Sequence, residues 1–200
     1  MKKGLGFLMA AMLLLGAFTV LPVHGEAGIY DRVIRLHVLA ASDSERDQAL
    51  KLTVRDEILK SAQTVLKNAK DRTEAEQLLR AALPELEQVA EDTLAEAGAP
   101  NSVTVTLGQE AYPTREYEQL AFPAGEYLSL RVMIGEAQGQ NWWCVLFPPL
   151  CLTAATERAE TEAVCLSAGL TGEQYRMIAD TDETKYKLRF KILEVAQELF

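Results

Sequence analysis

Histidine and cysteine, the residues that most often bind zinc, are scarce in this chain. Its 200 residues include two histidines and three cysteines. His24 lies in the amino-terminal leader, which leaves His37 for the rest of the chain. The spacings of Cys144, Cys151 and Cys165 match no known zinc pattern. We therefore expect no metal site and no cofactor.

The common catalytic motifs are also absent. The sequence has no G-x-S-x-G elbow, no C-x-x-C pair and no glycine-rich phosphate loop. Residues 43–45 and 180–182 begin like the aspartyl-protease motif Asp-Thr/Ser-Gly, but each has an acidic residue in place of the glycine. A cysteine nucleophile needs a nearby base, and His37 is far from Cys144 in the sequence. These absences argue against an enzyme, although an extracytoplasmic hydrolase or thiol enzyme with an unfamiliar site remains the alternative.

Clusters of basic residues are lacking too. The formal net charge is −9, with 20 basic and 29 acidic residues, and the basic residues are dispersed. Nucleic acids and anionic membranes attract proteins through clustered Lys and Arg. We therefore expect no nucleic-acid partner, and no small-molecule substrate is indicated either. The hydrophobic content of 48% is typical of a globular protein.

The amino terminus has the pattern of a secretory signal peptide. Two lysines precede an uncharged stretch over residues 5–23, and Gly25 provides a small residue for cleavage. The rival interpretation is an uncleaved anchor, because a membrane-spanning helix needs about 20 apolar residues. In both cases we expect residues 1–25 to direct export and residues 29–200 to form one domain outside the cytoplasm, where cysteines can oxidise.

The first part of this domain predicts a strand followed by a long helix. Alternating apolar residues over 32–40 indicate a half-buried strand. Ser42 and Glu45 have the spacing of a capping box, and apolar residues then recur at helical spacing over 44–69.

A second long helix is predicted to begin at another capping box, formed by Thr73 and Glu76. Pro84 lies inside the apolar stripe and is expected to kink the helix or split it in two. Gly98 occupies the position of a carboxy-terminal cap, and Pro100 prevents continuation.

The second half of the chain predicts strands more than helices. Alternation and turn residues indicate strands at 102–107, 112–117, 126–135 and 142–147. The last two are expected to pair as a hairpin. A short helix is expected near 173–179, and the last sixteen residues fit both a helix and a strand, of which we favour the helix. The fold class is α+β, with a mainly antiparallel sheet, two long helices in the amino-terminal half and a carboxy-terminal helix.

The densest apolar segment is NWWCVLFPPLC, residues 141–151. As a strand it places Trp143, Val145 and Phe147 on one face, and Trp142 with its alternating neighbours on the other. If both faces are covered, this is a central strand. If one face is open, the aromatic residues form a patch of the kind that marks interfaces. The residues that we predict to bind a partner are Trp142, Trp143, Phe147, Pro148 and Pro149.

Two further hypotheses concern the same segment and the start of the first helix. Cys144 and Cys151 can form a disulfide if the strand and its turn bring their Cα atoms within about 7 Å. Asp43, Arg46 and Asp47 form a second candidate partner-binding surface. Helix capping explains the acidic residues there without a partner.

Several segments resemble one protein family. IRLHVLAASDSERDQALKLTVRDEIL (34–59), YPTREY (112–117), FPAGEYLSLRVMIGEAQGQNWWCVLFPPLC (122–151) and KYKLRFKILE (185–194) are similar to stage II sporulation protein R of endospore-forming bacteria. The combination of NWWCVLFPPLC with the SDS-x-x-DQ-x-LK-x-x-VRD run is specific. The likeness is weak over 70–100 and 153–184.

The resemblance implies a function that the residue patterns do not reveal. Such proteins are made in the forespore and exported into the space between the two membranes of the sporangium. There they are thought to activate a membrane-embedded aspartyl-type protease, which removes the pro-sequence of sigma factor E. The resemblance thus implies a signalling protein without an active site of its own. A structural protein of the cell envelope is a further alternative.

Overall fold

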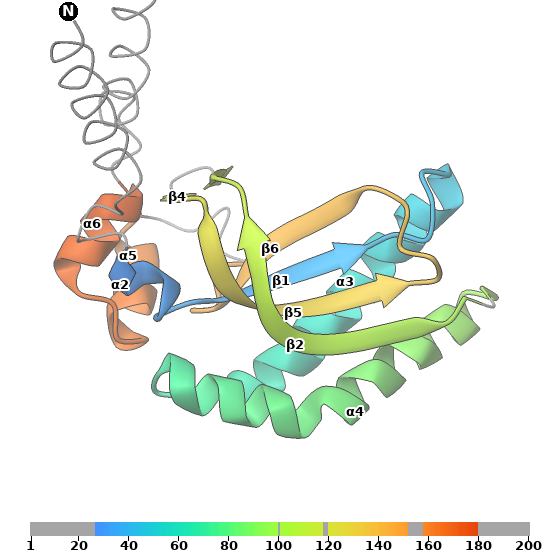
Figure 1. The fold of residues 1–200 in the computed structure, drawn as a ribbon. Coiled ribbons are helices and arrows are strands. Elements are labelled where there is room, and N and C mark those ends of the chain that lie inside the picture. The colour runs from blue at the N-terminus through green and yellow to red at the C-terminus, as the bar shows by residue number, and fades with distance from the viewer. Residues whose placement is uncertain (1–26, 100, 118–119, 152–157, 180–200) are drawn as a thin grey trace, which may run out of the picture.

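The computed structural model describes residues 27–99, 101–117, 120–151 and 158–179 (Figure 1). Its helices are α2 (Ala27–Tyr30), α3 (Glu45–Leu66), α4 (Arg72–Glu96), α5 (Arg158–Ser167) and α6 (Gly172–Ala179). Its strands are β1 (Ile34–Leu39), β2 (Val103–Tyr112), β3 (Arg115–Tyr117), β4 (Leu120–Phe122), β5 (Gly125–Ile134) and β6 (Asn141–Phe147). None of the helices in these ranges has the length and apolar character needed to cross a bilayer.

Four strands form the main sheet, in the order β2-β5-β1-β6. The β2–β5 and β1–β6 pairs are antiparallel, and β1 is parallel to β5. Strands β3 and β4 form a separate antiparallel pair. The predicted α+β class with a mostly antiparallel sheet is confirmed.

The predicted hairpin of β5 with β6 is wrong, because β1 lies between these two strands. Five of the six β1 residues are buried, including Arg35 and His37, so this strand needs neighbours on both edges. The connection from β5 to β6 crosses the end of β1. Its residues Gln138 and Gly139 donate backbone hydrogen bonds to Ala41 and Ala40, just after that strand.

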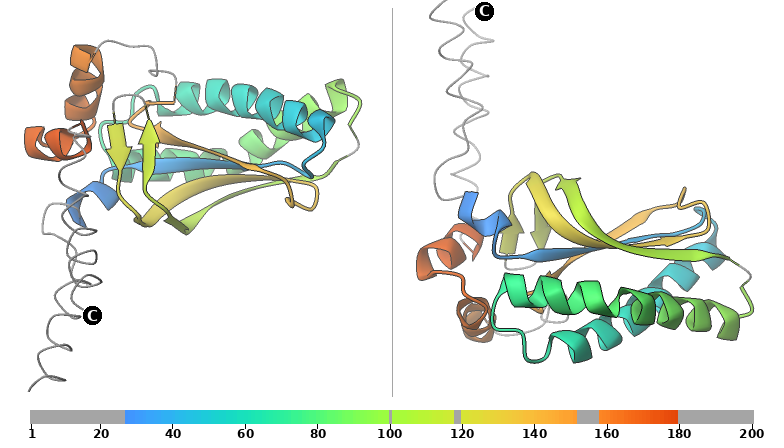
Figure 2. Two further views of the ribbon diagram at one scale, coloured as in Figure 1. Left: turned by 90° about the horizontal axis from the view of Figure 1, so that it is seen from above. Right: turned by 60° about the horizontal axis from the view of Figure 1, so that its bottom comes forward.

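The two long helices cover one face of the sheet (Figure 2). Their buried apolar residues pack against the inward-facing side chains of all four strands. The centre of this core includes Leu36, Val54, Ile58, Leu79, Leu86, Leu130 and Val132. This arrangement fits the predicted amphipathic character of both helices.

A second, smaller core lies on the opposite face, at the β3–β4 end of the sheet. It contains aromatic and aliphatic residues from α2, α5, α6 and the strands, including Ile29, Phe122, Tyr127, Cys165, Tyr175 and Ile178. The short helix predicted near 173–179 is confirmed as α6. Helix α5 was not predicted because Thr161 and Cys165 are its buried residues, too few for an apolar stripe.

Both long helices begin at caps two residues from the predicted ones. The Ser44 side chain, rather than that of Ser42, accepts the hydrogen bond of the α3 cap, from Asp47 N. Helix α4 is capped by Asp71, and Glu74 bonds back to the Lys70 amide. Ser, Thr and Asp are all favoured at N-caps, so the capping-box spacing alone does not decide between Ser42 and Ser44 or between Asp71 and Thr73.

The interior and the end of α4 can be compared with the prediction. The helix runs through Pro84 without a break, so of the two predicted alternatives, a kink or a split, the split is wrong. Gly98 has a φ of 64° and donates to Ala95 O, which confirms its role as the cap. Strand β2 extends to Tyr112, beyond the predicted end at 107, because all ten of its residues pair with β5. The prediction for 185–200 lies outside the described residues.

Candidate functional site

Strand β6 carries both tryptophans and lies at one edge of the main sheet. Trp142 is half-buried against the larger core, and the Arg55 guanidinium lies 4.8 Å from its ring centroid. Trp143 is half-buried on the opposite face, where the Arg115 guanidinium lies 3.6 Å from its ring. Each tryptophan thus pairs with an arginine, and the two pairs flank the same edge strand.

The predicted division of residues between the two faces of β6 fails at its end. Arg35 is opposite Val145 while Ile34 is opposite Phe147, so a bulge at Leu146 shifts the register by one residue. Leu146 and Phe147 therefore both face the helices, and Phe147 is 3% exposed. A strict alternation cannot predict this shift.

The bulge decides which predicted docking residues reach the surface. Phe147 and Pro148 are buried, so they support the corner from inside and do not form an exposed patch. Pro149 is exposed, and Trp142 and Trp143 are partly exposed. Of the five residues predicted to bind a partner on this segment, these three are therefore the accessible ones.

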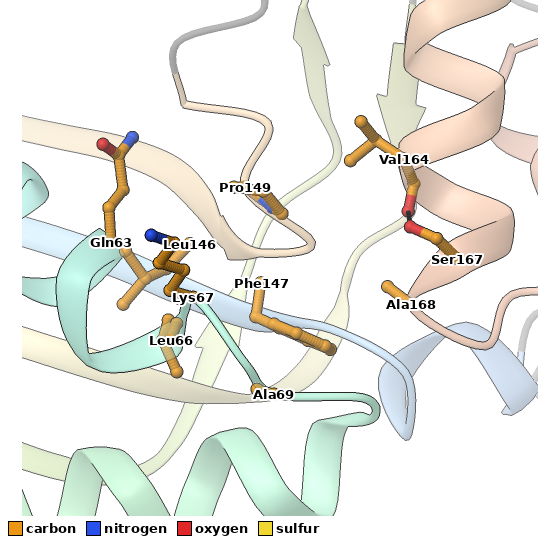
Figure 3. Close-up of a pocket in the computed structure, with 10 residues that line it drawn as sticks. All are labelled: Gln63, Leu66, Lys67, Ala69, Leu146, Phe147, Pro149, Val164, Ser167 and Ala168. Atoms are coloured by element: carbon orange, nitrogen blue, oxygen red, sulfur yellow. Dashed lines mark hydrogen bonds between the residues drawn. The ribbon is translucent and has the colours of Figure 1, made fainter.

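A cavity of about 390 Å³ lies beneath the Pro-Pro corner (Figure 3). Its walls come from three places: the end of α3, the end of β6 with its corner, and the end of α5. The lining residues are Gln63, Leu66, Lys67, Ala69, Leu146, Phe147, Pro149, Val164, Ser167 and Ala168. Most of these are apolar, so the cavity suits an aliphatic or aromatic group better than a charged one.

A disulfide joins Cys144 to Cys151 across the corner, with Cα atoms 5.4 Å apart. Beside it, the Leu150 amide donates to Val145 O. Together the two links hold the chain that follows the corner against the second half of β6.

Replacing Cys151 with serine is expected to lower the free energy of unfolding by about 2–3 kcal/mol, since the disulfide closes a short loop. Urea unfolding of the oxidised wild type and of the variant measures this loss. The oxidised wild type treated with a reductant should match the untreated variant. A variant as stable as the wild type would show that the bond contributes nothing to stability.

Polar residues at the start of α3 hold the connection that leads into β6. Asp43 accepts a hydrogen bond from Gln140 N at 2.7 Å, and Lys51 donates to Gln140 O at 3.0 Å. Lys51 is 5% exposed, and burial, together with the charge of Arg55, lowers its pKa. The SDS-x-x-DQ-x-LK run therefore positions the residue that leads into β6, the strand that carries both tryptophans.

The second predicted surface is occupied by such internal contacts. Besides the role of Asp43, Arg46 donates to Gly98 O at 3.1 Å, and Asp47 accepts a hydrogen bond from Ser42. These residues link the start of α3 to the end of α4 and to the β5–β6 connection. Their contacts explain them structurally without a partner.

The sequence did not predict a polar cluster beside Trp143, on the open face of the sheet, which is the face opposite α3 and α4. His37 Nδ1 lies 2.8 Å from Glu110 Oε1, and His37 Nε2 lies 2.9 Å from Asn141 Oδ1. Arg131 lies 3.9 Å from the same Glu110 oxygen. The signal for this cluster was present as polar residues alternating along strands, but the pairing of those strands was unknown.

The Glu110 carboxyl predicts that the free energy of unfolding decreases at acidic pH. Burial raises its pKa, but the hydrogen bonds with His37 and Ser129 and the charges of His37 and Arg131 outweigh burial, so the pKa lies below the usual 4.5. A carboxyl whose pKa is lower in the folded than in the unfolded protein stabilises the folded state at pH values above the unfolded pKa. This contribution is lost as the pH falls through the pKa of the folded state. We expect Glu110→Gln to be less stable at pH 7 and to lose less stability than the wild type between pH 5 and about 3. Thermal unfolding across this range tests it; parallel curves would contradict it.

The remaining cysteine does not have the surroundings of a reactive thiol. Cys165 is fully buried in the smaller core, and burial raises its pKa to about 12. A nucleophilic cysteine has a lowered pKa and access to solvent. Within the described ranges, no three His, Cys, Asp or Glu side chains lie close enough together to hold a metal ion.

Comparisons with known proteins point to one family. The family model described as Stage II sporulation protein R (spore_II_R) matches residues 30–157. Stage II sporulation protein R of Bacillus subtilis (strain 168) is 42% identical over 123 residues, which cover 62% of this chain and 55% of that protein. The match thus spans little more than half of the relative's length. No solved structure matches the chain significantly. The matched residues include β1 to β6 and the Pro-Pro corner.

Proposed function

This chain belongs to the stage II sporulation protein R family, and on this premise we propose that it is an exported signal of sporulation. In this proposal it acts in the space between the forespore and mother-cell membranes. It binds the extracytoplasmic part of a membrane-embedded aspartyl-type protease and activates it, and the protease then processes pro-sigma factor E. The chain itself catalyses no reaction.

The observation that carries this proposal is the pair of half-exposed tryptophans on an edge strand. Tryptophan and arginine are the residues most enriched where binding energy concentrates in interfaces. Trp142 with Arg55 and Trp143 with Arg115 provide both types at one place. The surrounding contacts, the Gln140 hydrogen bonds and the disulfide, hold this strand in position before any partner arrives. A preformed surface of this kind lowers the entropic cost of association.

Two features support export and a non-catalytic role. The leader has the pattern of a signal peptide, and a disulfide is stable in an extracytoplasmic compartment. The buried Cys165 lacks the environment that a thiol enzyme requires.

Activation of the protease requires that the bound protein favour the active state of the protease over its inactive state, since a ligand shifts an equilibrium only by its difference in affinity for the two states.

The proposal is tested in sporulating cells that lack the gene for this protein. Processing of pro-sigma factor E should stop in these cells and return when the full-length chain is supplied. A chain from which residues 1–25 are deleted should stay in the cytoplasm and fail to restore processing. Normal processing in the null strain would contradict the proposal and would favour a structural role in the envelope.

A further inference from the structure

The two outer edges of the main sheet are protected to different degrees. Along β2, the Glu87 side chain accepts a hydrogen bond from Val105 N at 2.8 Å, and Arg80 Nη1 donates one to Leu107 O at 3.5 Å. Both side chains come from α4. They occupy backbone groups that would otherwise be free to pair with another strand, which is how natural sheets protect an edge.

The edge formed by β6 is protected at its two ends. At its start, Asp43 and Lys51 occupy the backbone groups of Gln140. At its far end, Leu150 bonds to Val145, and the disulfide holds the returning chain there.

Between these points lie Asn141, Trp142 and Trp143. In the part of the chain that the structure describes, these three residues pair with β1 on one side, and no strand or side chain bonds to their backbone on the other. Three residues of open edge are enough for a short added strand and too few for the extended pairing that leads to aggregation.

The charges beside this open edge indicate what kind of strand fits it. Arg55 forms an ion pair with Asp56 at 2.7 Å. Arg115, over Trp143, forms no ion pair with any described residue, and its buried Nε atom has no hydrogen-bond acceptor. Arg131 lies on the same face and is 40% exposed, and it forms an ion pair with Glu110 at 3.9 Å. The face of the edge that carries Trp143 thus presents one cationic group, Arg115, that has no ion pair among the described residues, within a chain of net charge −9.

From this geometry we infer that the partner docks by adding an acidic, extended segment as a strand beside Asn141–Trp143. The inference rests on the proposed function and specifies how the partner is recognised. Backbone hydrogen bonds to the open edge supply affinity, and a carboxylate placed near Arg115 supplies specificity. A second copy of this chain fits less well, because pairing β6 with itself would bring one Arg115 toward the other without an acid between them.

The test uses the full chain, exported and oxidised, with detergent-solubilised membranes that contain the candidate protease. Amide hydrogen exchange is measured for residues 141–143 with and without these membranes, and cleavage of pro-sigma factor E is followed in the same mixtures. Affinity is measured for the wild type and for Arg115→Glu, with Arg176→Glu as the matched control on the exposed side of α6. Circular dichroism and thermal unfolding verify that each variant is folded.

Strand addition predicts slower exchange at 141–143 on binding, and an affinity at least about tenfold weaker for Arg115→Glu than for Arg176→Glu. If the wild type stimulates cleavage but exchange at 141–143 does not change and Arg115→Glu binds normally, strand addition is wrong and the proposed function stands. If exchange slows because two copies of the chain associate, the acidic partner strand is wrong. If the wild type neither binds nor stimulates cleavage, the proposed function fails and the inference fails with it.

Discussion

Changing Trp142 to alanine is expected to abolish processing of pro-sigma factor E while leaving the protein folded and exported. The ring lies on the edge strand β6, where it packs against the larger core and the Arg55 guanidinium and stays partly exposed. Truncating a tryptophan at the centre of an interface typically costs about 2–4 kcal/mol, which is a loss of affinity of roughly 30-fold to 1,000-fold. The measurement is the ratio of mature to precursor sigma factor in cells that carry the variant.

Two controls separate lost binding from lost folding. Leu52→Ala removes an apolar side chain that is 40% exposed on α3 and has no place in the proposed surface, so processing should stay normal. Trp142→Phe keeps an aromatic ring and should retain part of the activity. Normal processing with Trp142→Ala, at a wild-type level of exported protein, would remove this residue from the docking surface.

Changing Arg35 to alanine is expected to lower the free energy of unfolding by about 3–4 kcal/mol. This side chain is fully buried in the smaller core, and its guanidinium lies within 5.8 Å of the ring centroids of four aromatic residues, Tyr112, Tyr117, Phe122 and Tyr127. It also donates hydrogen bonds to Tyr117 and to the backbone of Cys144. Truncation would leave a cavity and unpaired polar groups.

The Arg35 prediction also distinguishes shape from charge. No carboxylate forms an ion pair with Arg35 in the described residues, so the surrounding rings and hydrogen bonds stabilise its charge. Arg35→Lys keeps the charge but loses the planar guanidinium group. We expect it to lower the free energy of unfolding by less than Arg35→Ala does. Chemical unfolding of the three proteins measures the order. A change below about 1 kcal/mol for alanine would contradict this structural role.

Local sequence patterns predicted the parts of the fold that depend on near neighbours. The apolar stripes located both long helices, and the alternation over residues 34–38 located β1. Gly98 was predicted as a cap from its position at the end of the helix, and its positive φ in the structure is a conformation that glycine adopts at little cost. The family resemblance through NWWCVLFPPLC agrees with the family that the comparisons show.

The features that were missed depend on contacts distant in sequence. The sequence of the β5–β6 connection is typical of a hairpin turn. In the structure the two strands are separated because the buried strand β1 pairs with both of them. The bulge that turns Phe147 inward arises from pairing with Ile34, more than a hundred residues earlier. The Arg115–Trp143 and His37–Glu110 pairs likewise join strands whose order the sequence did not define. The sequence therefore allowed the candidate site to be placed on β6, but not the prediction of which residues from other strands lie beside it.

A single reconstitution tests most directly whether this protein works by binding. Membranes that contain the candidate protease and pro-sigma factor E are mixed with the purified full chain, and cleavage is followed over time. We predict that the wild type starts cleavage in proportion to its occupancy of the protease, and that Trp142→Ala does not. Cleavage at the same rate without the protein, or equal stimulation by Trp142→Ala and the wild type, would contradict the account.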